Sequence, residues 1–158
     1  MKKRALILIS LIALVSCQYV ARHGKTPTQG PNLLKAAKEA LKKGDCAEAS
    51  ELLQRELKEN GKSFQALFWL GISEAMCGRY GRAYRYLQSS LGYAPSQKWT
   101  GRVYAATGFV FHLLNKEKEA AVYFKLAKET RYPTKLWELF NKGGLNRASG
   151  YKVILSWM

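Results

Sequence analysis

The fold is decided by residues 67–87, which read Leu67-Phe-Trp-Leu-Gly-Ile-Ser-Glu-Ala-Met-Cys-Gly-Arg-Tyr-Gly-Arg-Ala-Tyr-Arg-Tyr-Leu87. Apolar residues recur at helical spacing on both sides of Gly78, a residue typical of a turn. Gly71 lies before this turn, Ala83 lies twelve residues later, and Leu87 lies four residues after that. Small residues at facing positions let two helices approach closely. The stretch therefore predicts a pair of packed helices.

The same spacing recurs before and after this pair. It is found in Ala37, Ala49 and Leu53, and again in Gly108, Ala120 and Phe124. One pair cannot bury its apolar face alone, so stacking of about three pairs forms a core. Glycine, asparagine and proline residues divide this part of the chain into segments of helical length,. We predict an all-α domain over residues 32–142, with helices at 32–43, 46–58, 63–77, 80–92, 98–114, 117–130 and 134–142.

Both ends of this predicted domain carry further expectations. Asp45 and Thr134 are suitable N-caps for the second and the last helix, because their side-chain oxygens can accept backbone hydrogen bonds,. The last helix would cap the open end of the stack. We expect a C-terminal tail over 143–158. Its end, 151–158, is apolar, which fits either packing back onto the domain or contact with a partner.

The N-terminus is typical of an export signal. The basic residues 2–4 precede an apolar run over 5–15, which is shorter than the roughly 20 residues of a membrane-spanning helix. The run ends in Leu14-Val-Ser-Cys17, which resembles the lipobox of bacterial lipoproteins. The resemblance implies a signal peptide over 1–16, lipidation of Cys17, and a flexible tether over 17–31. Gln18 then implies the outer membrane, facing the periplasm, with the inner membrane or the cell surface as alternatives.

The helical repeat resembles the tetratricopeptide repeat (TPR) over roughly residues 30–133. The middle unit matches the motif best, through Leu67, Leu70, Gly71, Ala83, Leu87 and Pro95. The first unit departs from it, with Glu56 at a usually small position and Gly61 in place of the closing proline. The resemblance implies an α-solenoid of about three helix pairs whose first helices line a concave groove. Carried over by position, the partner-binding residues would be Leu34, Lys38, Phe68, Trp69, Ile72, Met76, Arg102, Phe109 and His112.

Three interpretations of this groove stay open. Phe68 and Trp69 would anchor an amphipathic helix or an extended peptide of another envelope protein, or they belong to the core between repeats. Lys38 and Arg102 would face an acidic partner. A groove closed around Trp69 and Phe109 would instead suit a small apolar ligand, as an accessory in transport.

Two further features carry expectations of their own. Arg79, Arg82 and Arg85 share a helix flank in a chain of net charge +15. They form either a solvated face or a contact for anionic lipid headgroups, lipopolysaccharide or an acidic protein surface. Cys46 and Cys77 lie on one rim of adjacent pairs in such a stack, so they either form a disulfide or remain separate thiols.

The chain has few residues suited to catalysis or metal binding. His112 is the one histidine of the predicted domain, and no catalytic or phosphate-binding sequence motif is present,. We therefore expect no enzyme activity, no metal or other cofactor, and no nucleic-acid partner. The expected function is that of a membrane-anchored scaffold or adaptor lipoprotein. By analogy, it would help a pilus, secretin or other envelope complex to assemble.

Overall fold

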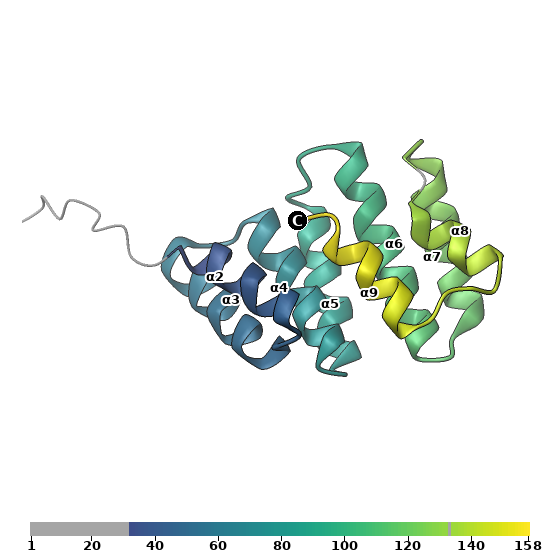
Figure 1. The fold of residues 1–158 in the computed structure, drawn as a ribbon. Coiled ribbons are helices and arrows are strands. Elements are labelled where there is room, and N and C mark those ends of the chain that lie inside the picture. The colour runs from purple at the N-terminus through teal and green to yellow at the C-terminus, as the bar shows by residue number, and fades with distance from the viewer. Residues whose placement is uncertain (1–31, 133) are drawn as a thin grey trace, which may run out of the picture. The chain divides into compact units, whose positions relative to one another are not determined.

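The computed structural model describes residues 32–132 and 134–158, and this part of the chain is all-α, as predicted. It contains eight helices and no strand (Figure 1). The helices are α2 (Leu33–Lys43), α3 (Cys46–Asn60), α4 (Phe64–Met76), α5 (Tyr80–Leu91), α6 (Gln97–Leu113), α7 (Glu117–Glu129), α8 (Lys135–Asn141) and α9 (Arg147–Leu155).

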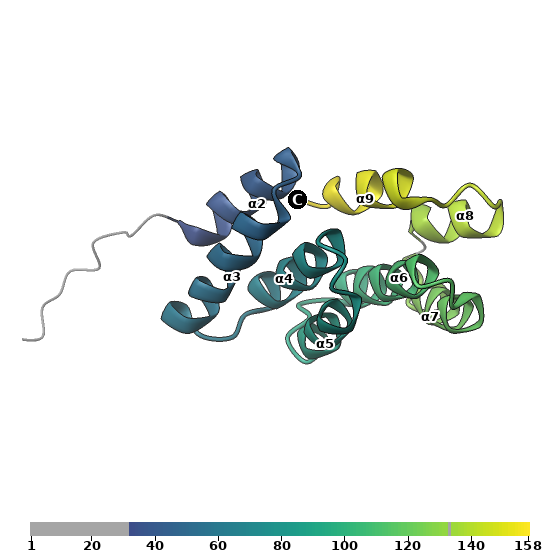
Figure 2. The same cartoon turned by 90° about the horizontal axis from the view of Figure 1, so that it is seen from below.

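The first six helices form three consecutive hairpins. Within each hairpin the two helices pack along their length, as α2 with α3, α4 with α5, and α6 with α7. Neighbouring hairpins meet where α3 contacts α4 and where α5 contacts α6. Figure 2 shows α4 and α6 between two layers, with α5 and α7 on one side and α9 on the other. The described helices belong to one compact unit, 32–158.

Small residues make the close helix crossings, as the spacing predicts. A Cβ atom added to Gly71 of α4 would lie 2.8 Å from Leu87 Cγ and 3.2 Å from the carbonyl oxygen of Ala83, both in α5. At Gly108 of α6, an added Cβ would lie 3.2 Å from the Ala120 carbonyl oxygen in α7. Distances this short leave little room for a side chain. Glycine at these two positions therefore sets the spacing of the second and third hairpins.

The helix boundaries agree with those predicted to within two residues. The Asp45 carboxylate accepts a hydrogen bond from the backbone N–H of Glu48, which confirms it as the N-cap of α3. Thr134 occupies the N-cap position of α8, but its hydroxyl makes no capping hydrogen bond and is buried without a partner. Gly44, Gly61 and Gly78 have φ between +77° and +83°, a left-handed conformation that glycine adopts without strain,.

The tail expected over 143–158 contains a helix that the sequence did not predict, α9. Asn146 and Ser149 make a capping box, in which each side chain accepts the other residue's backbone N–H,. Tyr151 and Ile154 follow at helical spacing and are buried. The helical domain thus continues past residue 142, and this apolar end of the chain packs back onto it.

The predicted signal peptide (1–16), the lipidation of Cys17 and the tether (17–31) lie outside the described residues. Within the described part of the chain, no helix combines the length and the apolar character needed to cross a membrane.

Candidate functional site

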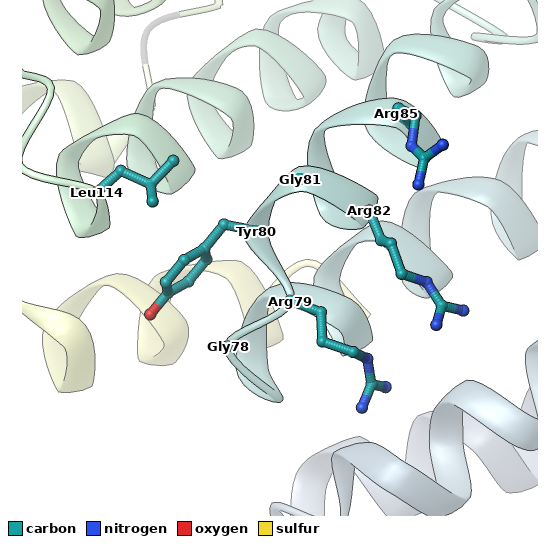
Figure 3. Close-up of a pocket in the computed structure, with 7 residues that line it drawn as sticks. All are labelled: Gly78, Arg79, Tyr80, Gly81, Arg82, Arg85 and Leu114. Carbon is teal, nitrogen blue, oxygen red and sulfur yellow. The ribbon is translucent and has the colours of Figure 1, made fainter.

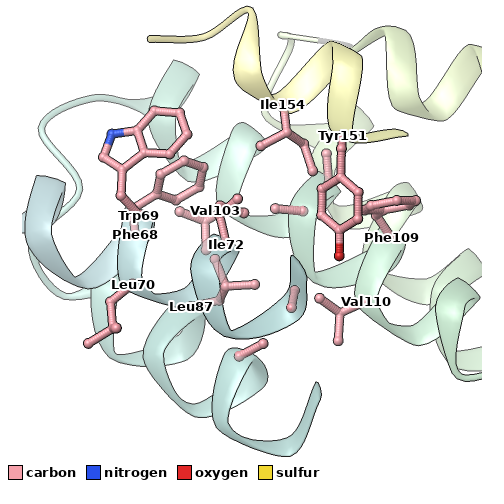
Figure 4. Packing of buried hydrophobic residues seen from close by; sticks show 14 of the residues in the cluster. Phe68, Trp69, Leu70, Ile72, Leu87, Val103, Phe109, Val110, Tyr151 and Ile154 are labelled. Atoms are coloured by element: carbon pink, nitrogen blue, oxygen red, sulfur yellow. The ribbon is translucent and has the colours of Figure 1, made fainter. Parts of the chain in front are cut away.

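The predicted groove residues fall into two groups. Phe68, Trp69 and Ile72 of α4 and Phe109 of α6 have 0–1% of their surface exposed. Of the interpretations left open by the sequence, this conformation matches the one in which these side chains are part of the core. They belong to the core of the domain (Figure 4). The other five are half-buried: Leu34, Lys38, Met76, Arg102 and His112.

The C-terminal helix covers the predicted floor. The Tyr151 ring packs edge-on against Phe109, with centroids 5.1 Å apart. The Trp157 ring lies 6.3 Å from the ring of Phe68. We call the surface formed by Phe68, Arg102 and Phe109 the covered face. In Figure 4, Tyr151 and Ile154 point from α9 into this cluster.

Gly150 brings α9 close to α6. A Cβ atom at position 150 would overlap the ring of Phe109. A glycine within a helix costs roughly 1 kcal/mol relative to alanine, so its presence here has a packing reason. The absence of a side chain lets the α9 backbone lie directly on the aromatic ring.

Arg102 joins the covered face to the end of the chain. Its guanidinium carbon lies 4.4 Å from the centroid of the Trp99 ring and 5.3 Å from that of Trp157. Burial lowers the pKa of Arg102 from its ordinary value. The side chain is therefore engaged with two aromatic rings of its own chain, in a cation–π arrangement.

Lys38 is also engaged within the domain. Its ammonium group donates to Gln65 Oε1 at 2.8 Å, and Trp69 Nε1 donates to the same oxygen at 3.2 Å. Burial, and then the charge of Lys42, lower the pKa of Lys38. Lys38 and Leu34 line a cavity of about 310 Å³ together with Met158, which brings the end of the chain to the first helix.

Met76 and His112 anchor the start of α9. The Met76 carbonyl oxygen accepts a hydrogen bond of 2.7 Å from Arg147. His112 Nε2 lies 3.0 Å from the Leu145 carbonyl oxygen, and Nδ1 lies 2.9 Å from Glu117 Oε1. The carboxylate and the carbonyl oxygen are both hydrogen-bond acceptors. His112 therefore acts as a bridge between α6, α7 and the segment leading into α9.

The predicted basic face is built on a buried carboxylate that the sequence analysis did not single out. Glu74 is fully buried, and it accepts hydrogen bonds from Arg79 Nε and from the Ser50 hydroxyl. It also forms an ion pair with Arg82, whose Nη2 lies 3.2 Å from Glu74 Oε1. Burial acts to raise the pKa of Glu74, but the hydrogen bonds from Arg79 and Ser50 and the two positive charges outweigh it, so the pKa is lowered. Arg79 and Arg82 thus have a structural role.

The three arginines nevertheless share one side of α5. Figure 3 shows Arg79, Arg82 and Arg85 pointing the same way, away from Tyr80 and Leu114. With Gly78 and Gly81, these residues line an open hollow of about 750 Å³. Arg79 and Arg82 keep 40% and 42% of their side-chain surface exposed. Both readings of this face, solvated or anion-binding, remain compatible with the geometry.

Cys46 and Cys77 form a disulfide, with Cα atoms 5.6 Å apart. Of the two alternatives left open by the sequence, the structure contains the bonded one. Cys46 is the first residue of α3 and Cys77 follows α4. Ser73 adds to this junction by donating a hydrogen bond of 2.7 Å to the Cys46 carbonyl oxygen. The bond therefore ties the first hairpin to the second.

Among the described residues, no group of three or more His, Cys, Asp or Glu side chains is placed to hold a metal ion. The arrangement offers surfaces for contact: a face covered by α9, and a basic face on α5. Comparisons with protein-family models and with curated proteins find no match to this chain.

Proposed function

We propose that this chain is a lipid-anchored, protein-binding scaffold with a TPR-like α-solenoid of about three helix pairs. One observation carries the solenoid: three successive hairpins repeat the same crossing of small residues. The second and third cross at Gly71 and Gly108, and the first at Ala37 and Ala49, which are fully buried. Stacked hairpins of this kind offer an extended surface built from many helices. Such surfaces suit the recognition of another protein's helix or peptide.

The cell envelope is the proposed location. The basic residues 2–4, the apolar run 5–15 and Cys17 support export and lipidation, and Gln18 supports the outer membrane, facing the periplasm. The disulfide between Cys46 and Cys77 fits this location, because disulfides persist in oxidising compartments,. More than one acyl chain would give stable anchoring. The narrower role, assembly of a pilus, secretin or other envelope complex, rests on analogy with lipoproteins of that kind.

The structure offers no support for the small-ligand alternative. It required a closed pocket around Trp69 and Phe109. The space beside Phe109 is instead filled by Gly150 and Tyr151 of α9.

Cell fractionation tests the anchoring. We expect the wild-type chain in the membrane fraction and a Cys17→Ala variant released into the soluble envelope fraction, because acyl chains would no longer hold it. The control is Cys46→Ser/Cys77→Ser, which leaves Cys17 in place and should stay with the membrane. A Cys17→Ala variant that remains membrane-bound, or a wild-type chain recovered in a soluble cytoplasmic complex, would contradict the proposed location.

A further inference from the structure

The helix α9 packs on the rest of the domain in the way that a bound amphipathic helix packs in the groove of a receptor. One side of α9 carries Gly150, Tyr151 and Ile154, which are buried against the domain, whereas Ala148 and Lys152 are exposed. Trp157 follows on the same path and meets Phe68 and Arg102. A helix that buries one face and exposes the other is the form in which amphipathic ligands occupy grooves.

The connection to α9 contains two glycines. Gly143 has φ +67°, and Gly144 follows it, directly after α8. An added Cβ at Gly143 would meet nothing within 4 Å, so this glycine has no packing role and serves the turn. The start of α9 is held by the buried side chain of Leu145 and by hydrogen bonds. His112 bonds the Leu145 carbonyl oxygen, and Arg147 bonds the Met76 carbonyl oxygen and the Tyr80 hydroxyl. A short glycine-containing link suits a helix that can leave as a unit.

The fit of α9 on the covered face is also incomplete. The Tyr151 hydroxyl is buried without a hydrogen-bond partner. An unsatisfied buried polar group costs roughly 1–3 kcal/mol. Burial also raises the pKa of Tyr151. By contrast, the hairpins pack on one another more extensively than α9 packs on α6. We therefore expect that lifting α9 relieves one unfavourable contact while the hairpins keep their own contacts.

Together these observations assign an occupant to the covered face. We propose that α9 is a removable ligand of this face, and that the partner of the proposed scaffold presents a helix with the same contact residues, which takes the place of α9. This inference rests on the proposed function for the existence of a partner. The binding-competent state is then the one in which α9 has left.

The contact residues define the chemistry of the partner helix. A glycine is required opposite Phe109, because any Cβ there would overlap the ring. An aromatic residue follows it directly, as Tyr151 does, then an aliphatic residue in the place of Ile154. A tryptophan in the place of Trp157 completes the cation–π contact with Arg102. Partner helices of this type read Gly, aromatic, two residues, aliphatic, two residues, Trp.

A peptide-binding measurement tests the proposal on the full chain. The probe is a fluorescein-labelled synthetic peptide of residues 145–158, followed by fluorescence anisotropy. A Gly150→Leu variant drives α9 off Phe109 and should bind the peptide about tenfold or more tightly than the wild type, in which α9 competes. The matched control is Ala148→Leu, which adds the same side chain on the exposed side of α9 and should bind like the wild type. A peptide carrying the Gly150→Leu change should bind neither variant.

The opposing outcomes are distinct. A Gly150→Leu protein that stays helical and melts cooperatively but binds the peptide no better than the wild type would overturn the proposal. Loss of the fold in this variant would also overturn it, since α9 would then be an indispensable part of the core. A wild-type dimer that dissociates when the peptide is added would assign the face to α9 of a second copy and would overturn the proposed partner.

Hydrogen exchange on the wild-type chain needs no variant. We expect the amides of α9 to exchange about tenfold or more faster than those of α4, because α9 opens without global unfolding. Equal protection of the two helices would overturn a removable α9. Neither measurement depends on finding a cellular partner. Failure of the proposed function, seen as absence of any partner in the envelope, is therefore distinguishable from failure of this inference.

Discussion

At the scale of the residue, Glu74 is the charge around which the start of α5 is built. Its carboxylate has no exposed surface, yet it is held by two arginines and one serine. A buried charge is tolerated when its oxygens are fully hydrogen-bonded. Arg79 and Arg82 were predicted from their spacing alone, as parts of a basic face. Their contacts show a second role, which is to neutralise the buried negative charge of Glu74.

Replacing Glu74 gives a prediction with a defined pH dependence. Its pKa in the folded chain lies below the ordinary value of 4.5. The carboxylate therefore stabilises the fold above about pH 4.5, and this contribution is lost as the pH falls through the lowered pKa. We expect Glu74→Gln to reduce the free energy of unfolding by about 1–3 kcal/mol at pH 7. The measurement is urea denaturation of both proteins at pH 7 and at pH 3.

The difference between the two proteins should shrink at pH 3, because below about pH 4.5 the unfolded chain takes up a proton at Glu74 that the folded chain, with its lowered pKa, takes up less readily,. Glu51→Gln is the control, because its side chain is exposed and it should change the pH dependence little. An equal stability difference at both pH values would contradict the role given to the Glu74 charge.

At the scale of the element, the disulfide connects the two hairpins nearest the N-terminus. The first hairpin is the one whose sequence departs most from the repeat pattern, with Gly61 in place of a closing proline. The bond closes a loop with a sequence separation of 31 residues. A covalent link of this kind restricts the unfolded chain most when the loop is long. The disulfide therefore stabilises the hairpin whose own sequence matches the repeat pattern least well.

Removal of the disulfide should lower stability without changing the fold. We expect Cys46→Ser/Cys77→Ser to reduce the free energy of unfolding by about 3–4 kcal/mol in the chain-entropy account. Urea denaturation with circular dichroism checks this, and reduction of the wild type should lower its midpoint to that of the variant. Insensitivity of the wild-type midpoint to reductant would show that the bond does not form or does not constrain the chain.

The elements also differ in how far the sequence predicts them. The helices from α2 to α8 could be predicted, because breakers such as Gly44 and Gly78 separate apolar segments and Asp45 is a clear N-cap. The helix α9 was missed, since the Asn146–Ser149 capping box is short and Gly150 weakens the helical pattern,. Because α9 was not predicted, the sequence did not show which segment covers Phe68 and Phe109. Periodicity identifies an apolar face, but it does not say which other segment covers that face.

At the scale of the whole molecule, the described unit has two distinct surfaces. The covered face combines the rings of Phe68 and Phe109 with Arg102 and is occupied by the chain's own C-terminal segment. The basic face on α5 presents Arg79, Arg82 and Arg85 around an open hollow. Met158 lines the cavity beside Leu34 and Lys38 of α2. The end of the chain therefore lies beside the first helix of the first hairpin. A partner entering where α9 lies would therefore pass close to Leu34.

Site-specific photo-cross-linking in the cells that make the protein tests most directly whether this chain binds another envelope protein. A photoreactive amino acid replaces Leu34, beside the end of α9, or Val122 of α7, which is 58% exposed and serves as the control. The account predicts one discrete protein adduct from position 34, stronger when Gly150→Leu is added, and none from position 122. No adduct from position 34 in either background, or the same adducts from both positions, would contradict it.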